Sequence, residues 1–179
     1  MYSVVISLIS RMAKRLHRRT YHASGPNYTW HIDGYDKIKR FGLAIHGCID
    51  GFSRKLIWLK VYSTNNDPWI VAGYFYEALE EYAGCPKVVR GDCGTENVNI
   101  KNKQEALMAN GQNGHQAAYI EGQSSSNQRI EVFWSHLRKQ CLEYWICMLS
   151  TIEEQGEFLG DFIDKNIAQF CFMPIIQVS

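Results

Sequence analysis

Three consecutive strand-like segments near the start of the chain limit the folds that it can adopt. Residues 28–33, 43–50 and 55–62 are rich in β-branched and aromatic residues, as strands are. The second and third are joined by Asp50-Gly51-Phe52-Ser53, a sequence typical of a tight hairpin turn. The folded part of the chain is therefore expected to open with three antiparallel strands.

Helices and strands alternate after this opening. The helical spacing of apolar residues, with Asp67 as N-cap and Pro68 at the first helical position, predicts a helix that ends at Gly84. A break near Gly156 or Gly160 separates one or two further helices that reach about residue 172. Between the helix that ends at Gly84 and the C-terminal helices, the sequence predicts four elements in this order: a strand at residues 87–90, a helix at 98–109, a strand at 117–120 and a long helix at 130–141. This order predicts an α/β domain, a mixed five-stranded sheet flanked by helices.

The chain has room for one such domain. Its 179 residues, 46% of them hydrophobic, are enough to bury a single core. The turn sequence Ser24-Gly25-Pro26-Asn27 marks the first boundary. We expect residues 1–24 to be a basic arm or a truncated upstream segment. Residues 25–179 would then be the folded domain, truncated at its C-terminal end.

Basic residues gather in the arm, although the net charge of the whole chain is only +1. The tract at residues 11–19 can be interpreted as a phosphate contact, a nuclear import signal, or a solvated tail. His17 and His22 are spaced like half of a zinc site, but no cysteine pair follows them. The six cysteines form no C-x-x-C pair, which favours reduced thiols in an intracellular protein. The apolar residues 2–9 are too few to span a bilayer.

Three acidic residues occupy positions from which they could share one site. Asp33 ends the first strand, Asp92 ends the fourth, and Glu131 lies in the first turns of the long helix. Carboxylates at strand ends can converge, and their hard oxygen atoms are the ligands that Mg²⁺ prefers. A single aspartate at a strand end is more often a turn or capping residue. The combination of three favours a metal site.

Four segments in this order resemble a known family. WHIDG, HGCIDGFSRKLIWL, RGDCGTEN and GQSSSNQRIEVFW are similar to the integrase core domain of the DDE superfamily, which includes retroviral-type integrases and transposases. The separations agree with this family too, with 58 residues between Asp33 and Asp92 and 38 between Asp92 and Glu131. The resemblance runs from about residue 21 to the end of the chain. It is strongest to integrase core domain-containing proteins of animal genomes that derive from mobile elements.

The resemblance implies a ribonuclease H-like catalytic core at residues 25–179. In this family Asp33, Asp92 and Glu131 would be the catalytic residues and the ligands of two Mg²⁺ or Mn²⁺ ions. The chain would be a polynucleotidyl transferase that cleaves and joins DNA strands in the nucleus, as a homo-oligomer, with neither a membrane nor a small-molecule substrate as partner. Two alternatives stay open. One is a domesticated, catalytically silent module that binds nucleic acid or protein, and the other is a ribonuclease H-like nuclease.

Polar residues on the long helix are candidates for contact with DNA. Gln128, Ser135 and Arg138 are spaced at −3, +4 and +7 from Glu131 and so share its face of a helix. Arg138 and Lys139 could hold a DNA phosphate, and Gln128 could contact the DNA end. An ordinary polar helix face is the alternative. Ser135 stands where retroviral-type cores often carry a lysine.

Other prominent residues are predicted to be structural. Asp50 lies in the hairpin turn at the far end of the second strand, so we interpret it as a turn residue. Asp36 and Glu96 fall in loops, where a spare carboxylate is common. The tryptophans, Trp134 among them, fall mostly on core-facing patterns and are expected to pack rather than to stack on bases.

Overall fold

The protein is described here from a computed structural model, which places residues 24–109, 117–122 and 127–178. Several expectations fall outside these described residues. They are the apolar opening at residues 2–9, the basic tract at 11–19, the pair His17 and His22, and the polar loop at 123–126.

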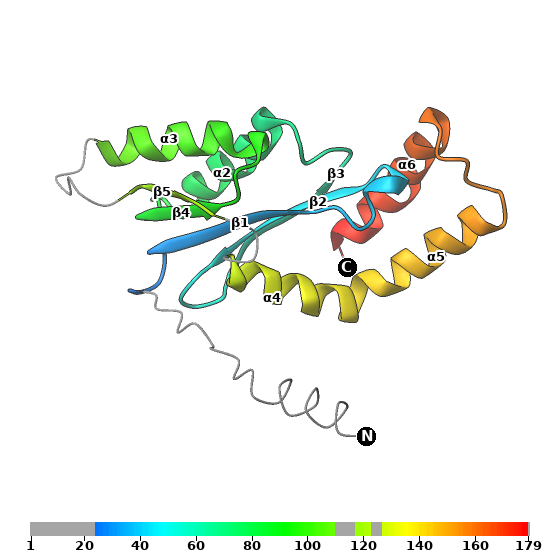
Figure 1. The fold of residues 1–179 in the computed structure, drawn as a ribbon, viewed down its shortest axis with the longest axis horizontal. Coiled ribbons are helices and arrows are strands. Elements are labelled where there is room, and N and C mark those ends of the chain that lie inside the picture. The colour runs from blue at the N-terminus through cyan, green and yellow to red at the C-terminus, as the bar shows by residue number, and fades with distance from the viewer. Residues whose placement is uncertain (1–23, 110–116, 123–126, 179) are drawn as a thin grey trace, which may run out of the picture.

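A mixed five-stranded sheet forms the centre of the molecule (Figure 1). Its strands lie in the order β3-β2-β1-β4-β5. The first three pair antiparallel, whereas β4 pairs in parallel with both β1 and β5. The strands are β1 (Thr29–Tyr35), β2 (Ala44–Asp50), β3 (Leu56–Tyr62), β4 (Val88–Gly91) and β5 (Tyr119–Glu121). The predicted ribonuclease H-like arrangement of strands and helices is confirmed.

Helices cover both faces of this sheet (Figure 1). One face carries α2 (Pro68–Glu81) and α3 (Val98–Ala109), and the other carries α4 (Gln128–Leu137), α5 (Glu143–Glu154) and α6 (Phe162–Val178). Short 3₁₀ turns lie at η1 (Lys39–Phe41) and η2 (Thr95–Asn97). Asp67 is the N-cap of α2, as predicted, and its side chain accepts a hydrogen bond from the backbone N–H of Trp69.

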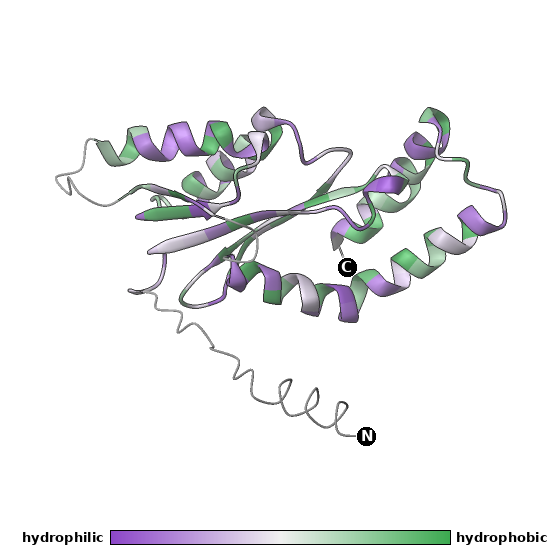
Figure 2. Ribbon diagram, viewed as in Figure 1, coloured by the Kyte–Doolittle hydropathy of each residue, from purple (hydrophilic) through white to green (hydrophobic). Residues whose placement is uncertain are grey.

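Each face of the sheet buries its own hydrophobic core. Figure 2 shows that the helices carry both hydrophobic and hydrophilic residues, as expected for helices with one face on a sheet. On the α2 side, Trp30 packs edge-to-face against Trp58, Phe75 and Tyr82. On the α4 side, Ile45 and Ile130 belong to the second core. Burial on both faces fixes which side chains of β1 point toward α4.

The long helix predicted over residues 130–141 is interrupted. α4 ends at Leu137 and is followed by a π-helical segment, Arg138–Leu142, before α5 begins at Glu143. The expected stripe through Cys141 is confirmed, because Phe133, Leu137 and Cys141 all pack half-buried against the core. Beyond it, Leu142 and Trp145 are buried.

The last helix reaches further than the expected residue 172. Gly156 and Gly160 both have positive φ, which confirms the predicted break between α5 and α6. α6 continues through Pro174, and Ile176 is buried. The side chain of Gln177 accepts from the backbone N–H of Val61 (2.7 Å) and donates to the carbonyl oxygen of Leu59 (2.8 Å). It thus bonds to the free edge of β3. In the described part of the chain, we find no helix long and apolar enough to cross a membrane.

Candidate active site

Asp33 lies in β1, two residues before its end and not at the end as predicted, and Asp92 directly follows the adjacent strand β4. β1 and β4 pair in parallel, with His31 opposite Arg90. Continuing this register by two residues brings Asp33 opposite Asp92. Opposite residues of neighbouring parallel strands point to the same face, with backbones about 4.8 Å apart. Both carboxylates therefore belong to the sheet face that α4 covers.

Glu131 approaches the same place from α4. Ile130 and Trp134 are the buried residues of this helix, and Glu131 is half-buried beside them. Its negative charge raises the pKa of Asp33, as does that of Asp92, so each of these two carboxylates lies within electrostatic range of Asp33. Ser135, one turn further, donates its hydroxyl hydrogen bond to the Glu131 carbonyl oxygen (3.3 Å). Glu131 is thus placed with the two aspartates.

Asn127 attaches the start of α4 to β1. Its Nδ2 donates to the carbonyl oxygen of Ile32 (2.8 Å), and its Oδ1 contacts His31 Nδ1 (2.5 Å). Because burial lowers the pKa of His31 to about 4, the imidazole is neutral and donates its Nδ1–H to Asn127. Asparagine before a helix is usually interpreted as an N-cap, but Asn127 makes no capping bond. No local sequence signal reveals this link, which anchors α4 next to Asp33.

Trp134 contacts a predicted metal ligand directly. Its indole Nε1–H donates to Asp33 Oδ2 at 2.8 Å. The indole lies over Gly47 of β2, where a Cβ atom would come within 2.7 Å of the Trp134 ring. Tyr35 packs on its other side, with ring centroids 5.2 Å apart. Packing was predicted for Trp134, but its hydrogen bond was not. It occupies one Asp33 oxygen and orients the carboxylate.

The Asp33 carboxyl has a strongly altered acidity. Its pKa is raised from 3.8 to about 7, and burial is the largest cause. The hydrogen bond from Trp134 acts in the opposite direction, whereas the charges of Glu131 and Asp92 raise the pKa again. At neutral pH the ionised form of Asp33 is therefore unfavourable unless a positive charge compensates it.

We expect Asp33→Asn to stabilise the metal-free protein in a pH-dependent way. The folded-state pKa of about 7 exceeds the ordinary 3.8, so the stability that this carboxyl contributes is full below about pH 4 and is lost as pH rises through about 7. Asparagine does not ionise, so the variant does not lose stability in this way as pH rises. Its advantage in unfolding free energy should be large at about pH 8 and small at about pH 5, measured by urea unfolding in EDTA. An advantage independent of pH would contradict the raised pKa.

Asp92 is held by the turn that follows β4. Its Oδ1 accepts from Asn97 Nδ2 (2.8 Å) and from the Gly94 backbone N–H (3.1 Å). Glu96, which was predicted to be a spare loop carboxylate, also lies near: burial raises its pKa, and the charge of Asp92 raises it further. A fourth acidic group therefore stands at the edge of the site.

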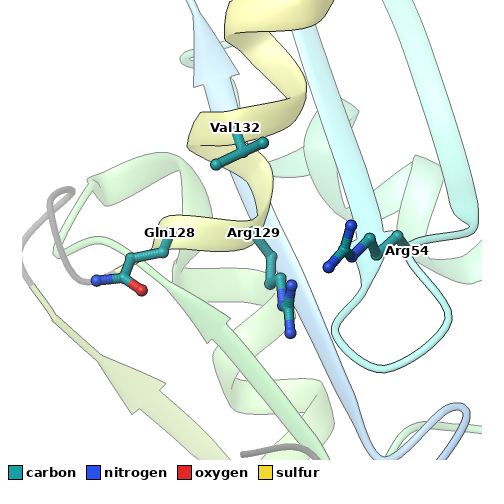
Figure 3. A pocket seen from close by; sticks show the side chains of 4 residues that line it. All are labelled: Arg54, Gln128, Arg129 and Val132. Atoms are coloured by element: carbon teal, nitrogen blue, oxygen red, sulfur yellow. The ribbon is translucent and has the colours of Figure 1, made fainter. Parts of the chain in front are cut away.

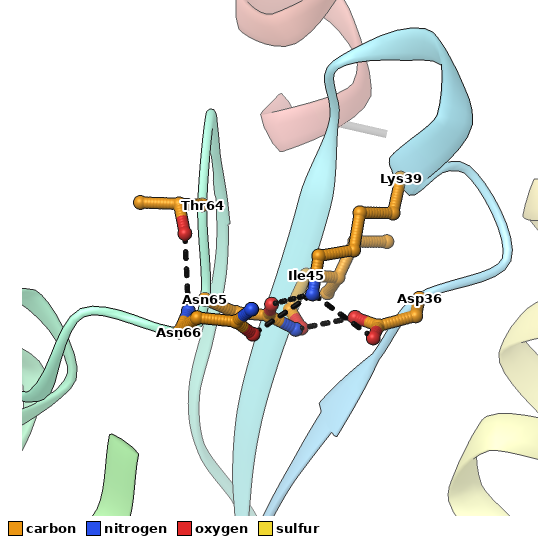
Figure 4. A network of polar contacts seen from close by, with 6 residues as sticks. All are labelled: Asp36, Lys39, Ile45, Thr64, Asn65 and Asn66. Atoms are coloured by element: carbon orange, nitrogen blue, oxygen red, sulfur yellow. Dashed lines mark hydrogen bonds and ion pairs between the residues drawn. The ribbon is translucent and has the colours of Figure 1, made fainter. Parts of the chain in front are cut away.

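Asp36, the other spare carboxylate, belongs to a structural network (Figure 4). Asn65 Nδ2 donates to Asp36 Oδ1 (2.7 Å) and to the Ile45 carbonyl oxygen (3.1 Å). Lys39 Nζ donates to Asp36 Oδ2 (3.1 Å), and also to the side-chain oxygens of Asn65 (3.1 Å) and Asn66 (2.8 Å). These bonds tie the loop after β1 to the segment before α2. They leave Asp36 with a structural role.

The hairpin residue Asp50 is fully used in holding its turn. The backbone N–H groups of Asn27 (2.9 Å) and Ser53 (2.7 Å) and the Ser53 hydroxyl (2.5 Å) all donate to its carboxylate. Asp50 is buried at the end of β2, opposite Trp30 of β1 and therefore away from the Asp33 end. The structure agrees with the interpretation of Asp50 as a turn residue.

The three residues predicted to contact DNA are separated in the structure. Gln128 lies at the start of α4, while Arg138 and Lys139 lie in the π-helical segment at its end. Arg138 Nε donates to Glu143 Oε2 at 2.8 Å, a half-exposed ion pair. Lys139 is exposed. Contact of all three with DNA stays a prediction.

The donor set fits a hard divalent cation in its chemistry. The negative charges of Asp92 and Glu131 raise the pKa of Asp33. A bound cation would relieve this repulsion between carboxylates. Within the described residues, however, no group of three His, Cys, Asp or Glu side chains is close enough to hold a metal ion. Binding would therefore require Asp33, Asp92 and Glu131 to approach one another more closely.

Comparison with known proteins identifies the family of the chain. A family model for the integrase core domain matches residues 20–179, a range that includes Asp33, Asp92 and Glu131. A search of curated proteins finds no match. Because this family model matches most of the chain, the resemblance of the four sequence segments to the integrase core domain is confirmed. The chain belongs to the integrase core domain family.

Proposed function

We propose that this domain is a DDE-type polynucleotidyl transferase that cleaves and joins DNA strands. The observation that supports this proposal is that Asp92 and Glu131 both lie near enough to Asp33 for their charges to raise its pKa. Buried like charges cost stability, so their convergence favours a role that needs them together. The family to which the chain belongs supports the same reaction class.

In this proposal each carboxylate is held by its own structural partner. Trp134 orients Asp33, Asn97 orients Asp92, and Asn127 fixes the start of the helix that carries Glu131. Two Mg²⁺ or Mn²⁺ ions at these carboxylates would activate a water molecule or a DNA 3′-hydroxyl and would stabilise the leaving oxygen. Attack by water would cut a strand, and attack by a 3′-end would join two strands.

Metal-dependent strand transfer by the purified chain tests this function. We expect it to join a labelled DNA end to a target duplex in Mg²⁺ or Mn²⁺, and not in EDTA. Either metal should also raise the melting temperature, because it binds the folded state. A chain that is folded but shows neither product nor thermal shift would be the silent nucleic-acid- or protein-binding module. Cleavage without joining would favour the ribonuclease H-like nuclease.

Partners and location follow from the same proposal. DNA would be the substrate, because the chain belongs to the integrase core domain family. Assembly into a homo-oligomer and a nuclear location remain proposals. The basic tract at residues 11–19 supports nuclear import or phosphate contact through its charge alone.

A further inference from the structure

Two arginines from distant parts of the chain line one pocket beside the candidate active site. The pocket has a volume of about 200 Å³ and is lined by Arg54, Gln128, Arg129 and Val132. Figure 3 shows the guanidinium groups of Arg54 and Arg129 directed into the space between α4 and the β2–β3 turn. Arg54 belongs to the segment DGFSR and Arg129 to NQRIE, and the proposed function so far gives neither arginine a role. The fold thus brings the two arginines together.

The lining favours an anion. No carboxylate among the described residues forms an ion pair with Arg54. Gln128 and Arg129 occupy the first turn of α4, whose backbone N–H groups point toward the helix start. The Asn127 side chain does not cap them, because it is bonded to β1 instead. Two guanidinium groups and an uncapped helix start together attract a phosphate.

The backbone of Arg54 is an independent observation. Its φ is +62°, in the left-handed region that arginine adopts at a cost. Glycine or asparagine would relieve this strain at the same turn position. Strained residues cluster at functional sites, and the strain at Arg54 is consistent with a role for its guanidinium.

The pocket and the carboxylates lie on the same face of the sheet. The Asn127 side chain, next to Gln128 and Arg129 in the chain, bonds to His31 and to the Ile32 carbonyl oxygen, so the start of α4 lies against β1. Asp33 follows His31 by two residues, which is about 6.6 Å along a strand. A nucleic acid strand on this face would therefore present one phosphate to the carboxylates and a neighbouring one to the arginines.

We propose that Arg54 and Arg129 form a backbone-phosphate site that positions duplex DNA beside the carboxylates. This inference rests on the proposed function for its choice of DNA. The contact is to the backbone, so it would supply affinity and register rather than sequence preference. It extends the predicted role of Gln128, whose amide lies at the same helix start.

Binding measured in EDTA tests the pocket without any chemistry. Fluorescence anisotropy of a labelled duplex should show several-fold weaker binding for Arg54→Asn and for Arg129→Gln. Each variant should also lower the slope of log K against log salt by about 0.9, the value for one lost phosphate contact. Val132→Glu, which places a negative charge at an exposed position of the pocket, should weaken binding further. Lys103→Gln, on α3 and across the sheet, is the matched control and should keep the affinity of the parent.

The same experiment distinguishes a lost phosphate contact from misfolding of the variants and from binding of a different ligand. Arg54→Asn should melt no lower than the parent, because asparagine tolerates positive φ. Parental affinity and salt slope in both arginine variants would overturn the proposal. So would tighter Arg54-dependent binding of duplex RNA than of duplex DNA.

The result for the pocket is independent of the result for catalysis. If the arginine variants lose DNA binding and the parent does not cleave DNA in Mg²⁺, the phosphate site is supported and the proposed function is rejected. If the parent cleaves DNA and the arginine variants bind it normally, the proposed function is supported and the phosphate site is rejected.

Discussion

Replacing Asp33 or Asp92 by asparagine, or Glu131 by glutamine, should abolish metal-dependent strand cleavage and joining while the protein stays folded. Each change keeps the size of the side chain but removes a charge that would hold the metal ions. Metal ions supply several kcal/mol of transition-state stabilisation, so each variant should lose at least about a thousandfold in rate. The metal-free variants should be as stable as the parent or more so, because repulsion among the acids is relieved. Single-turnover strand transfer and urea unfolding measure the two effects.

Asp50→Asn is the control for this series. Asp50 is bonded to Asn27 and Ser53 and lies at the other end of β2, so the change should cost about 1–2 kcal/mol of stability and leave activity largely intact. If Asp50→Asn eliminates activity and Asp33→Asn does not, the first ligand is wrongly chosen. The site would then have to be redrawn around β2.

Asn127→Ala should damage both stability and activity, because it removes the link between α4 and β1. The change leaves His31 Nδ1 and the Ile32 carbonyl oxygen buried without their partner. At about 1–3 kcal/mol for each unsatisfied group, the free energy of unfolding should fall by roughly 2–4 kcal/mol. Glu131 lies on the first turn of the released helix, and a displacement near 1 Å can cost about a hundredfold in rate. Urea unfolding and strand transfer well below the melting temperature measure the two losses.

Two variants separate this effect from a general loss of asparagine. Asn102→Ala, at an exposed position of α3, should change stability by no more than about 0.5 kcal/mol and should keep activity. Asn127→Asp retains an acceptor for His31 but loses the donor to Ile32 and buries a negative charge near Asp33, so it should not rescue activity. Full activity in folded Asn127→Ala would show that the link does not position Glu131.

Local signals in the sequence were enough to locate most elements of the fold. The five strands and α3 lie within two residues of their expected bounds, and α2 ends three residues before the expected Gly84, because periodicity and turn residues depend on near neighbours. Asp67 and Pro68 marked the start of α2 for the same reason. β1 runs to Tyr35, past the expected end at Asp33, because its pairing with β2 continues to Ile45. That extension depends on a partner strand, which no local signal reveals.

The sequence by itself determined the α/β class, the family and the three acidic candidates, since these rest on patterns that can be read within short segments. Only the tertiary structure decided how the segments meet. The parallel pairing of β1 with β4 brings Asp92 near Asp33, a π-helical segment follows α4, and Asn127 bonds to β1 rather than capping α4. Each depends on contacts between residues far apart in the chain. Packing on both faces of the sheet selects those contacts, and the preferences of single residues do not encode them.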